Sequence, residues 1–385
     1  MANAPHEPGM TNAPVWEDGR GTGLAPLPGN TAATACVLGL GGSGLACVHE
    51  LLDLGVDVIG LDAGQVASGA AGRNGGFLLA GAADFHHAAI ARHGRERALR
   101  IYLLTLQQMD RMQQETPNAV RRPGSLRIAA SPDELDDCEA HYDAMRADDL
   151  DVERYDGPEG RGLLFPADGV FNPLQRCRAL AAAALERGAR LYGDTAAVEV
   201  RTGEVTTSRG TIECDQVFIA TDGGMAALLP RLAGRVRTAR LQMLATAPTA
   251  EVQLDRPVYW RYGFEYWQQL PDGRIALGGF RDTGGDEEWT QDTHPSAHIQ
   301  LRLERHLREV VGVAAPVTHR WAASVGFTAD GLPILDEVAP GVLAFGGYSG
   351  TGNVIGALCG RGAARHVFTG DDELVAPFLS PRRPA

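Results

Sequence analysis

The chain has 385 residues, of which 44% are hydrophobic, and a formal net charge of −13 at pH 7. This length exceeds the size at which a single hydrophobic core keeps growing, so we expect two domains. The negative charge argues against nucleic acid and anionic membrane surfaces as partners, because like charges would repel.

Targeting signals are not expected in this sequence. No stretch approaches the ~18 apolar residues of a membrane helix, and the first residues lack the basic start and apolar centre of a signal peptide. The six cysteines form no Cys-x-x-Cys pair, which is typical of core residues in a reducing compartment. We therefore expect a cytoplasmic protein without a membrane anchor. Residues 1–33, rich in Gly, Pro, Asn and Ala, predict a leader whose first ten residues are disordered.

Residues 35–62 have the pattern of a strand, a glycine turn, an amphipathic helix and a second strand. The turn is Gly39-x-Gly41-x-x-Gly44, in which the glycines allow a tight turn and close helix packing. The helix N-terminus would offer free N–H groups and partial positive charge to a pyrophosphate. Asp62 would accept hydrogen bonds from ribose hydroxyls. This unit predicts dinucleotide binding.

A long Gly/Ala loop follows, where a simple nicotinamide-binding fold would have a helical crossover. Residues 69–76, Gly-Ala-Ala-Gly-Arg-Asn-Gly-Gly, suit backbone lying against a large flat ring system. With residues 39–62, this loop resembles the amino-terminal FAD site of the D-amino-acid-oxidase superfamily, most closely its gamma-glutamylputrescine-oxidase branch. Ala71 replaces a serine of that branch, and Ala63 a basic residue. The resemblance implies cofactor contacts from Gly39, Gly41, Gly42, Ser43, Gly44, Asp62, Ala63, Gly72, Arg73, Asn74, Gly75 and Gly76.

Helical and strand patterns alternate through the middle of the chain. Helices are expected at 82–115, 131–147 and 173–188, and strands at 125–130, 162–170, 190–192, 196–201 and 204–214. An apolar strand at 215–220 then ends at Thr221, and this break resembles the second FAD-contacting strand end of the superfamily. Val198 matches the position near the adenine. An ordinary strand and turn would give the same local pattern.

Residues 259–279 predict a β-hairpin that is rich in aromatic residues and turns at Pro271-Asp-Gly273. Strand and helix patterns flank it at 240–246 and 295–311. In the resembling family a sheet here covers the flavin, so one hairpin face would line the substrate pocket. The pocket candidates are Tyr259, Arg261, Glu265, Trp267 and, from a later loop, Tyr348. Alternatively, half of the rings are core, and Glu265 is a surface residue or an ion-pair partner of Arg261.

The last segment returns to the cofactor. Residues 321–333 and 346–352 resemble the carboxy-terminal signatures of the superfamily, with a strand at 342–345 and a helix at 353–368. The helix N-terminus would face the flavin pyrimidine ring and stabilise the negative charge of reduced flavin. The implied contacts are Gly347, Tyr348, Gly350, Thr351 and Gly352.

Together these patterns predict an α/β fold, a Rossmann-like FAD-binding domain with an inserted α+β substrate domain that contains an antiparallel sheet. The FAD-binding domain is expected to comprise residues 34–82, 170–224 and 322–385, and the substrate domain residues 83–169 and 225–321. The histidine spacings do not match a metal-ligand pattern, so no metal is expected.

The resemblance implies an oxidase that converts the C–N bond of a small-molecule amine to an imine, with FAD as cofactor and dioxygen as acceptor giving hydrogen peroxide. The alternatives are an amino-acid oxidase of the glycine, D-amino-acid or sarcosine type, a flavin dehydrogenase that passes electrons to a carrier, and a flavoprotein subunit or sensor. FAD is expected to be noncovalent, because Ala323 and Arg73 stand where related enzymes attach it through Cys or His.

The substrate is expected to lack an α-carboxylate. The two arginines of glycine-oxidase type, which would bind a buried carboxylate in a bidentate manner, correspond here to Val325 and Gly350. Arg261 or Arg281 on the hairpin is the alternative source of that positive charge.

Overall fold

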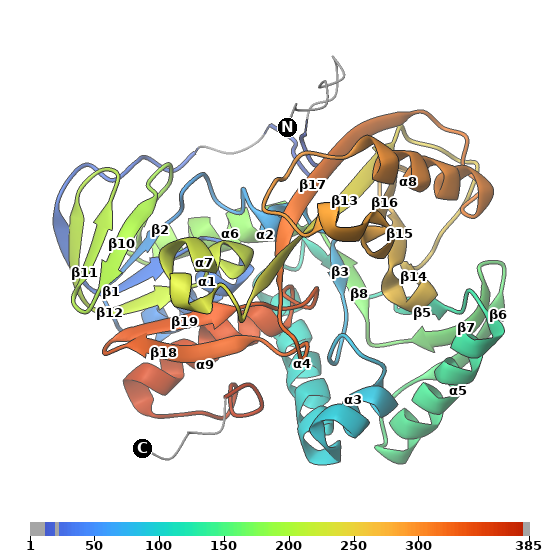
Figure 1. Cartoon of the computed structure of the whole chain (residues 1–385), viewed down its shortest axis with the longest axis horizontal. Coiled ribbons are helices and arrows are strands. Elements are labelled where there is room, and N and C mark those ends of the chain that lie inside the picture. Colours follow the sequence, from blue (N-terminus) through green and yellow to red (C-terminus); the bar gives the residue numbers. More distant parts are fainter. Residues whose placement is uncertain (1–11, 20–22, 380–385) are drawn as a thin grey trace.

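A computed structural model describes residues 12–19 and 23–379, so the expectation for the first ten residues lies outside the described range. Figure 1 shows two lobes side by side, each centred on a sheet, with segments from far apart in the sequence meeting in each. Every helix in the described ranges is too short or too polar to cross a lipid bilayer.

The lobe at the left of Figure 1 contains a sheet with a parallel centre. The parallel strands, in spatial order, are β9 (Arg190–Tyr192), β2 (Val58–Leu61), β1 (Thr31–Leu38), β12 (Thr211–Ile219) and β19 (Val342–Gly346). Because these strands are parallel, their carboxyl ends lie at one edge of the sheet. The antiparallel strands β10 (Ala197–Arg201), β11 (Glu204–Thr207) and β18 (Ile334–Ala339) all lie on the β12 side of the sheet: β11 pairs with the first part of β12, and β18 pairs with β19.

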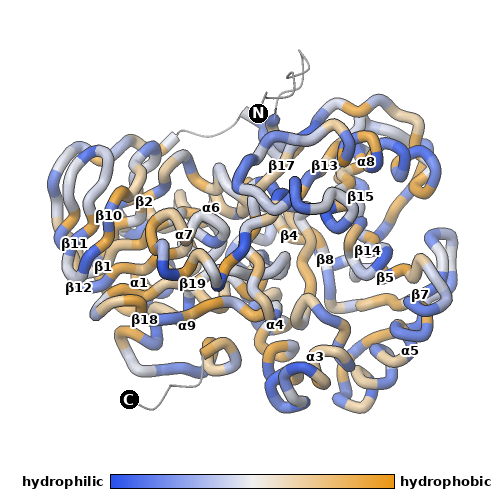
Figure 2. The backbone as a smooth tube through the Cα atoms, in the orientation of Figure 1, coloured by the Kyte–Doolittle hydropathy of each residue, from blue (hydrophilic) through white to orange (hydrophobic). Residues whose placement is uncertain are grey.

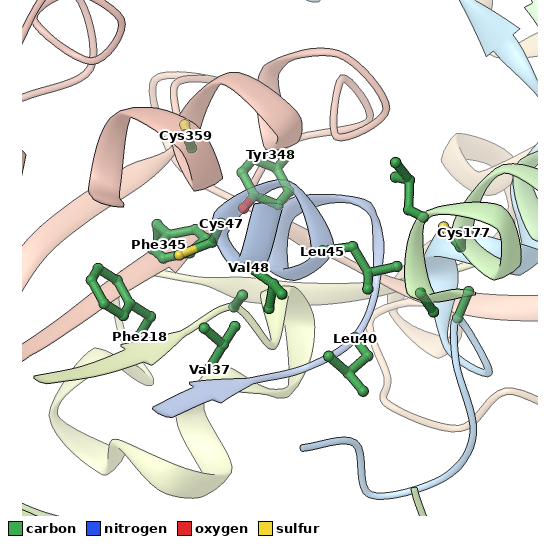
Figure 3. Packing of buried hydrophobic residues seen from close by; sticks show 14 of the residues in the cluster. Val37, Leu40, Leu45, Cys47, Val48, Cys177, Phe218, Phe345, Tyr348 and Cys359 are labelled. Atoms are coloured by element: carbon green, nitrogen blue, oxygen red, sulfur yellow. The ribbon is translucent and has the colours of Figure 1, made fainter. Parts of the chain in front are cut away.

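Helices cover this sheet, and the largest core lies between the two layers. The helices are α1 (Gly42–Asp53), α6 (Pro173–Glu186) and α9 (Ile355–Thr369). Figure 3 shows Val37 and Phe218 of the strands close to Val48 of α1, within the same buried cluster. In Figure 2 the hydrophobic residues concentrate along the central strands and α9, as burial on both sides requires.

The second lobe contains an eight-stranded, largely antiparallel sheet. Its strands, in spatial order, are β17 (Val317–Phe327), β13 (Arg237–Thr246), β16 (Ile275–Gly279), β15 (Glu265–Gln269), β14 (Val258–Trp260), β5 (Ser125–Ile128), β7 (Gly160–Phe165) and β6 (Glu153–Gly157). Helix α8 (Ala297–Glu309) packs on it through Ile299, Leu303 and Leu307. Helices α3 (His86–His93), α4 (Arg95–Glu115) and α5 (Pro132–Ala147) complete the lobe.

Short elements connect the lobes. Strands β3 (Phe77–Leu78), β8 (Gly169–Phe171) and β4 (Val120–Arg121) form a small third sheet, and α2 (Ala70–Arg73) and α7 (Met225–Leu228) are single helical turns. The α/β architecture agrees with the sequence-based prediction.

Two expected boundaries differ in the structure. The helix expected at 82–115 is two helices, because Gly94 between them has φ +84°. The domain boundary expected at residue 322 falls inside β17, which runs unbroken along the second sheet. The hairpin turns at Pro271–Gly273, but its first arm is interrupted at 261–264, where Arg261 and Tyr262 have positive φ.

Candidate functional site

A cavity of about 990 Å³ lies between the lobes, at the upper end of the range for small-molecule sites. Its first wall is the edge where the carboxyl ends of β1, β2 and β12 meet, with the loop that follows β19. Its far wall is the face of the second sheet at β14–β16. One continuous space therefore runs from the parallel sheet to the antiparallel one.

The N-terminus of α1 faces this space. Gly41, Gly42 and Ser43 line the cavity, and the helix has no side-chain cap. Gly39 has φ +100°, and a Cβ on Gly44 would lie 1.8 Å from the Gly39 carbonyl oxygen. These two glycines set the tight turn and the close packing, and they leave uncapped amides that attract an anion.

Asp62 follows β2 at the same edge. Its carboxylate accepts hydrogen bonds from the amides of Leu40, at 2.8 Å, and Gly64, at 3.0 Å. Burial raises the pKa of this carboxyl, and the two amides oppose that effect. Val198, 64% exposed, also lines the cavity.

Thr221 and Asp222 follow β12. The Thr221 hydroxyl is buried and has no hydrogen-bond partner in the described part of the chain, although it lines the cavity. Asp222 accepts from the amides of Gly326 (2.9 Å) and Gly347 (2.8 Å), which joins three strand ends. Burial raises its pKa despite these bonds. The cofactor contacts predicted from the sequence do not include Asp222, although its position directly after an apolar strand is a signal for such a residue.

The glycine loop before α9 also borders the cavity. Gly350, Thr351 and Gly352 line it. Figure 3 shows Tyr348 between α9 and α1, with its hydroxyl directed toward α1. Tyr348 is 5% exposed, and its hydroxyl is buried. Most of this ring is therefore core, and only part of it reaches the cavity.

Residues of the leader form hydrogen bonds with the loop at 69–76 on the side away from the cavity. Arg73 points away from the cavity and donates to the carbonyl oxygen of Ala322 (2.8 Å) and to Asn12 (2.6 Å to Oδ1). The Trp16 indole donates to the Asn74 carbonyl at 2.9 Å. Asn74 and Gly75 line the cavity. The leader thus holds the loop against the parallel sheet.

Aromatic rings form the wall on the second sheet. Tyr259 and Tyr266 stack with their centroids 5.8 Å apart, and Phe77 meets both edge-on. The Tyr266 ring also lies against Gly75, where a Cβ would come within 2.9 Å. Burial raises the pKa of Tyr259 to about 12, and Tyr266 is shifted in the same direction. Both phenols therefore stay protonated at neutral pH.

Two arginines without a counterion add positive charge to this wall. Arg281 and Arg127 line the cavity, and within the described residues neither guanidinium makes an ion pair or a hydrogen bond, although both lie against aromatic rings. Arg281 lies 4.5 Å above the Phe327 ring, at the end of β17. Burial lowers the pKa of both guanidinium groups. A ligand anion would relieve this unpaired charge.

Three of the expected pocket residues lie outside the cavity lining. Arg261 donates to Glu265 at 2.8 and 2.5 Å and to Asp282 at 2.9 Å, and the Glu265 side chain is fully buried. Trp267 packs in the core under α8. The structure thus shows the alternative interpretation of Glu265, an ion pair with Arg261.

The other site residues expected from the sequence form two groups, those that line the cavity and those that do not. Those that line the cavity are Gly39, Gly41, Gly42, Ser43, Asp62, Ala63, Asn74, Gly75, Val198, Thr221, Tyr259, Tyr348, Gly350, Thr351 and Gly352. Those that support it from behind are Gly44, Gly72, Arg73, Gly76 and Gly347. Within the described residues, no cluster of three or more His, Cys, Asp or Glu side chains has a geometry that would hold a metal ion.

The chain is similar to known proteins over most of its length. The family model described as DAO, FAD dependent oxidoreductase, matches residues 34–366. The probable oxidoreductase OrdL of Rhizobium meliloti (strain 1021) is 29% identical, over 87% of this chain and 83% of that protein. The gamma-glutamylputrescine oxidoreductase of Escherichia coli (strain K12) is 24% identical, over 90% and 85%. The L-proline dehydrogenase structure from P. horikoshii superposes with a TM-score of 0.76 at 18% identity, over 91% and 98%.

Proposed function

We propose, from the premise that this chain belongs to the DAO family of FAD-dependent oxidoreductases, that it oxidises the C–N bond of a small amino compound to an imine. The observation that carries the proposal is the single cavity that joins the uncapped N-terminus of α1 to the Tyr259–Tyr266 wall. A dinucleotide that begins at α1 would present its ring system to that wall. A substrate against the wall would then meet the ring.

The residues present fit FAD. The amides at Gly42 and Ser43 would receive the pyrophosphate, and Asp62 keeps carboxylate lone pairs for ribose hydroxyls. The orphaned Thr221 hydroxyl requires a polar partner, which a bound cofactor would supply. When bound, FAD supplies the hydride-accepting ring, and the protein supplies position and charge.

The cofactor would be noncovalent. Among the described residues, Cys177 is the only cysteine that lines the cavity, and burial raises its thiol pKa to about 11. No histidine lines the cavity within the described ranges. Ala323 and Arg73, at the attachment positions of related enzymes, cannot form such a bond.

The amine would have to reach the ring in its neutral form, and the charge of the site favours this. Arg281 and Arg127 both raise the positive potential at the aromatic wall. A positive potential and burial each lower the pKa of a bound ammonium. The proton could therefore leave to solvent without a dedicated carboxylate base.

Arg281 changes the expectation for the substrate. A half-buried guanidinium next to the wall, with no counterion among the residues that the structure describes, is a suitable bidentate partner for a substrate carboxylate. We therefore favour an amino compound that carries a carboxylate near its C–N bond, of the amino-acid-oxidase type, over a monoamine. Dioxygen is the proposed acceptor, and a carrier protein is the alternative.

The test is a screen of flavin reduction. The purified holoprotein is mixed anaerobically with glycine, sarcosine, D- and L-amino acids, monoamines and polyamine derivatives, and bleaching of the oxidised-flavin spectrum is followed. Carboxylate-bearing amines should bleach the flavin fastest, and admission of air should restore the spectrum with stoichiometric hydrogen peroxide. Bleaching by none of these amines would refute the proposed function. Reduction without reoxidation by air would favour the dehydrogenase.

A further inference from the structure

Within the described part of the chain, four arginines line the cavity, and they are not equivalent. They are Arg92, Arg127, Arg176 and Arg281. Arg92 is paired with Asp84 at 2.8 Å and Arg176 with Glu115 at 2.9 Å. Arg281 is the carboxylate partner proposed above. Arg127 raises the positive potential at the wall but has no ligand group assigned to it, and no ion pair or hydrogen bond reaches its guanidinium from the described residues.

Arg127 is held in place by rings instead of by acids. Its Cζ lies 4.5 Å from the Phe85 ring centroid and 5.9 Å from that of Phe165. Stacking of this kind fixes the guanidinium plane and leaves the N–H groups at its edge available. Arg127 lines the main cavity and also a small void of about 30 Å³.

The nearest carboxylates are already used by other donors. Asp168 accepts from the amide of Ala80 at 3.0 Å and from the hydroxyl of Ser125 at 2.7 Å. Glu134 accepts from the amides at the start of its own helix and of the 261–263 turn. Neither lies within ion-pair distance of Arg127, although both act on it electrostatically. The protein therefore holds these acids away from the guanidinium.

Arg127 and Arg281 lie at opposite sides of the aromatic wall. Arg281 contacts Phe327, next to Gly326, which is bonded to the strand ends of the parallel sheet. Arg127 lies on β5, the neighbour of β14, with Phe85 of the α3 segment above it. The electrostatic neighbour of Arg281 is Tyr266, and that of Arg127 is Tyr259. A ligand along the two stacked rings would have a cation at each end.

We propose that Arg127 is a distal anion subsite, and that the preferred substrate is an amino compound with a second carboxylate remote from the C–N bond that reacts. The inference rests on the proposed function and specifies its substrate class. A guanidinium has donors but no acceptor, so the matching group is an anion that accepts two hydrogen bonds. Because Asp168 and Glu134 already accept hydrogen bonds from other donors, the position beside the Arg127 guanidinium is open to a ligand anion.

Binding of dicarboxylates tests the subsite without turnover. The probes are the series from malonate to adipate and the corresponding monoamides, titrated into the FAD-loaded protein by calorimetry and by perturbation of the flavin spectrum. The best dicarboxylate should bind about 10- to 100-fold more tightly than its monoamide. Arg127→Met should reduce that ratio to about threefold or less, and Arg127→Lys should keep part of it. Arg154→Met, which removes another ring-stacked arginine outside the cavity, should leave the ratio unchanged.

Two results would overturn the inference. One is equal binding of dicarboxylates and monoamides by the wild-type protein. The other is an unchanged ratio in Arg127→Met with a normal flavin spectrum; should that variant lose FAD, Arg127→Lys is used with the same criterion.

Turnover separates this inference from the proposed function: glutamate and glutamine, as D and L forms, share the reacting amine and differ only in the distal group. Equal oxidation of both overturns the subsite alone, whereas no flavin reduction by any amine overturns the function.

Discussion

Replacing Arg281 by Met should lower activity but not stability, whereas the same change at Arg261 should do the reverse. The two residues make a matched pair, because both are half-buried and both lie over the Phe264 ring, at 5.8 and 5.1 Å. Arg261 binds Glu265 and Asp282, but Arg281 has no counterion in the described part of the chain. The structure therefore gives them opposite roles.

The expected changes in stability and activity follow from the charged groups that each substitution leaves without a partner. Arg261→Met leaves the carboxylate of Glu265, 0% exposed, without its partner, and an uncompensated buried charge costs about 3–5 kcal/mol. Arg281→Met removes an unpaired cation whose pKa burial already lowers, so the free energy of unfolding should stay within about 0.5 kcal/mol or rise. Loss of a charge-assisted contact of about 1.5–3 kcal/mol to a substrate carboxylate corresponds to about 10- to 150-fold in kcat/KM.

Urea unfolding of the holoprotein, followed by flavin fluorescence at fixed FAD concentration, measures the first quantity. Steady-state oxidation of the best carboxylate-bearing amine measures the second, with FAD content as the control. Destabilisation of Arg281→Met by more than about 2 kcal/mol, or an Arg261→Met protein as stable as the wild type, would refute this assignment of the two arginines.

Three further predictions concern the cofactor loop, the glycine turn and a buried acid. Asn12→Ala removes the side-chain acceptor of Arg73 and should raise the Kd for FAD about tenfold in fluorescence titrations of the apoprotein; an unchanged Kd would mean that the leader does not hold the loop. Gly44→Ala places a Cβ 1.8 Å from the Gly39 carbonyl oxygen and should yield protein without bound FAD, so a normal flavin spectrum in this variant would contradict the packing. Burial raises the pKa of Asp168 to about 6, above its unfolded value, so its contribution to stability is present below about pH 4 and is lost as pH rises through 6. Asp168→Asn should flatten the stability profile between pH 4 and 8 by up to about 3 kcal/mol, and identical wild-type and variant profiles would exclude this.

The parallel half of the fold could be predicted from sequence because its signals are local. Gly39, Gly44 and Asp62 lie within one strand–helix–strand unit, and the chemistry of a phosphate turn needs those residue types at that spacing. Helix ends also have local sequence signals. At Ser131, for example, the side-chain hydroxyl accepts a hydrogen bond from the amide of Glu134.

The antiparallel half could not be predicted in the same way. Glu265 and Trp267 are two residues apart, so a strand places their side chains on the same face. Which face meets the cavity depends on the neighbouring strands and on α8, which covers Trp267. The interruption at Arg261, with positive φ, also breaks the alternation on which the pocket candidates rested. Arg127 and Arg281 are 154 residues apart in the sequence, so only the tertiary fold brings them to the same wall.

The central claim is that this chain uses FAD to oxidise an amino compound held against the Tyr259–Tyr266 wall. Anaerobic rapid mixing of the holoprotein with an amino acid deuterated on the carbon beside nitrogen tests it most directly. The account predicts that the flavin is bleached at a rate that the deuterium lowers, with the imine-derived carbonyl product formed in equal amount and with Arg281→Met slowed about 10- to 150-fold. Flavin bleached by a reduced nicotinamide and by none of the amino compounds would contradict it.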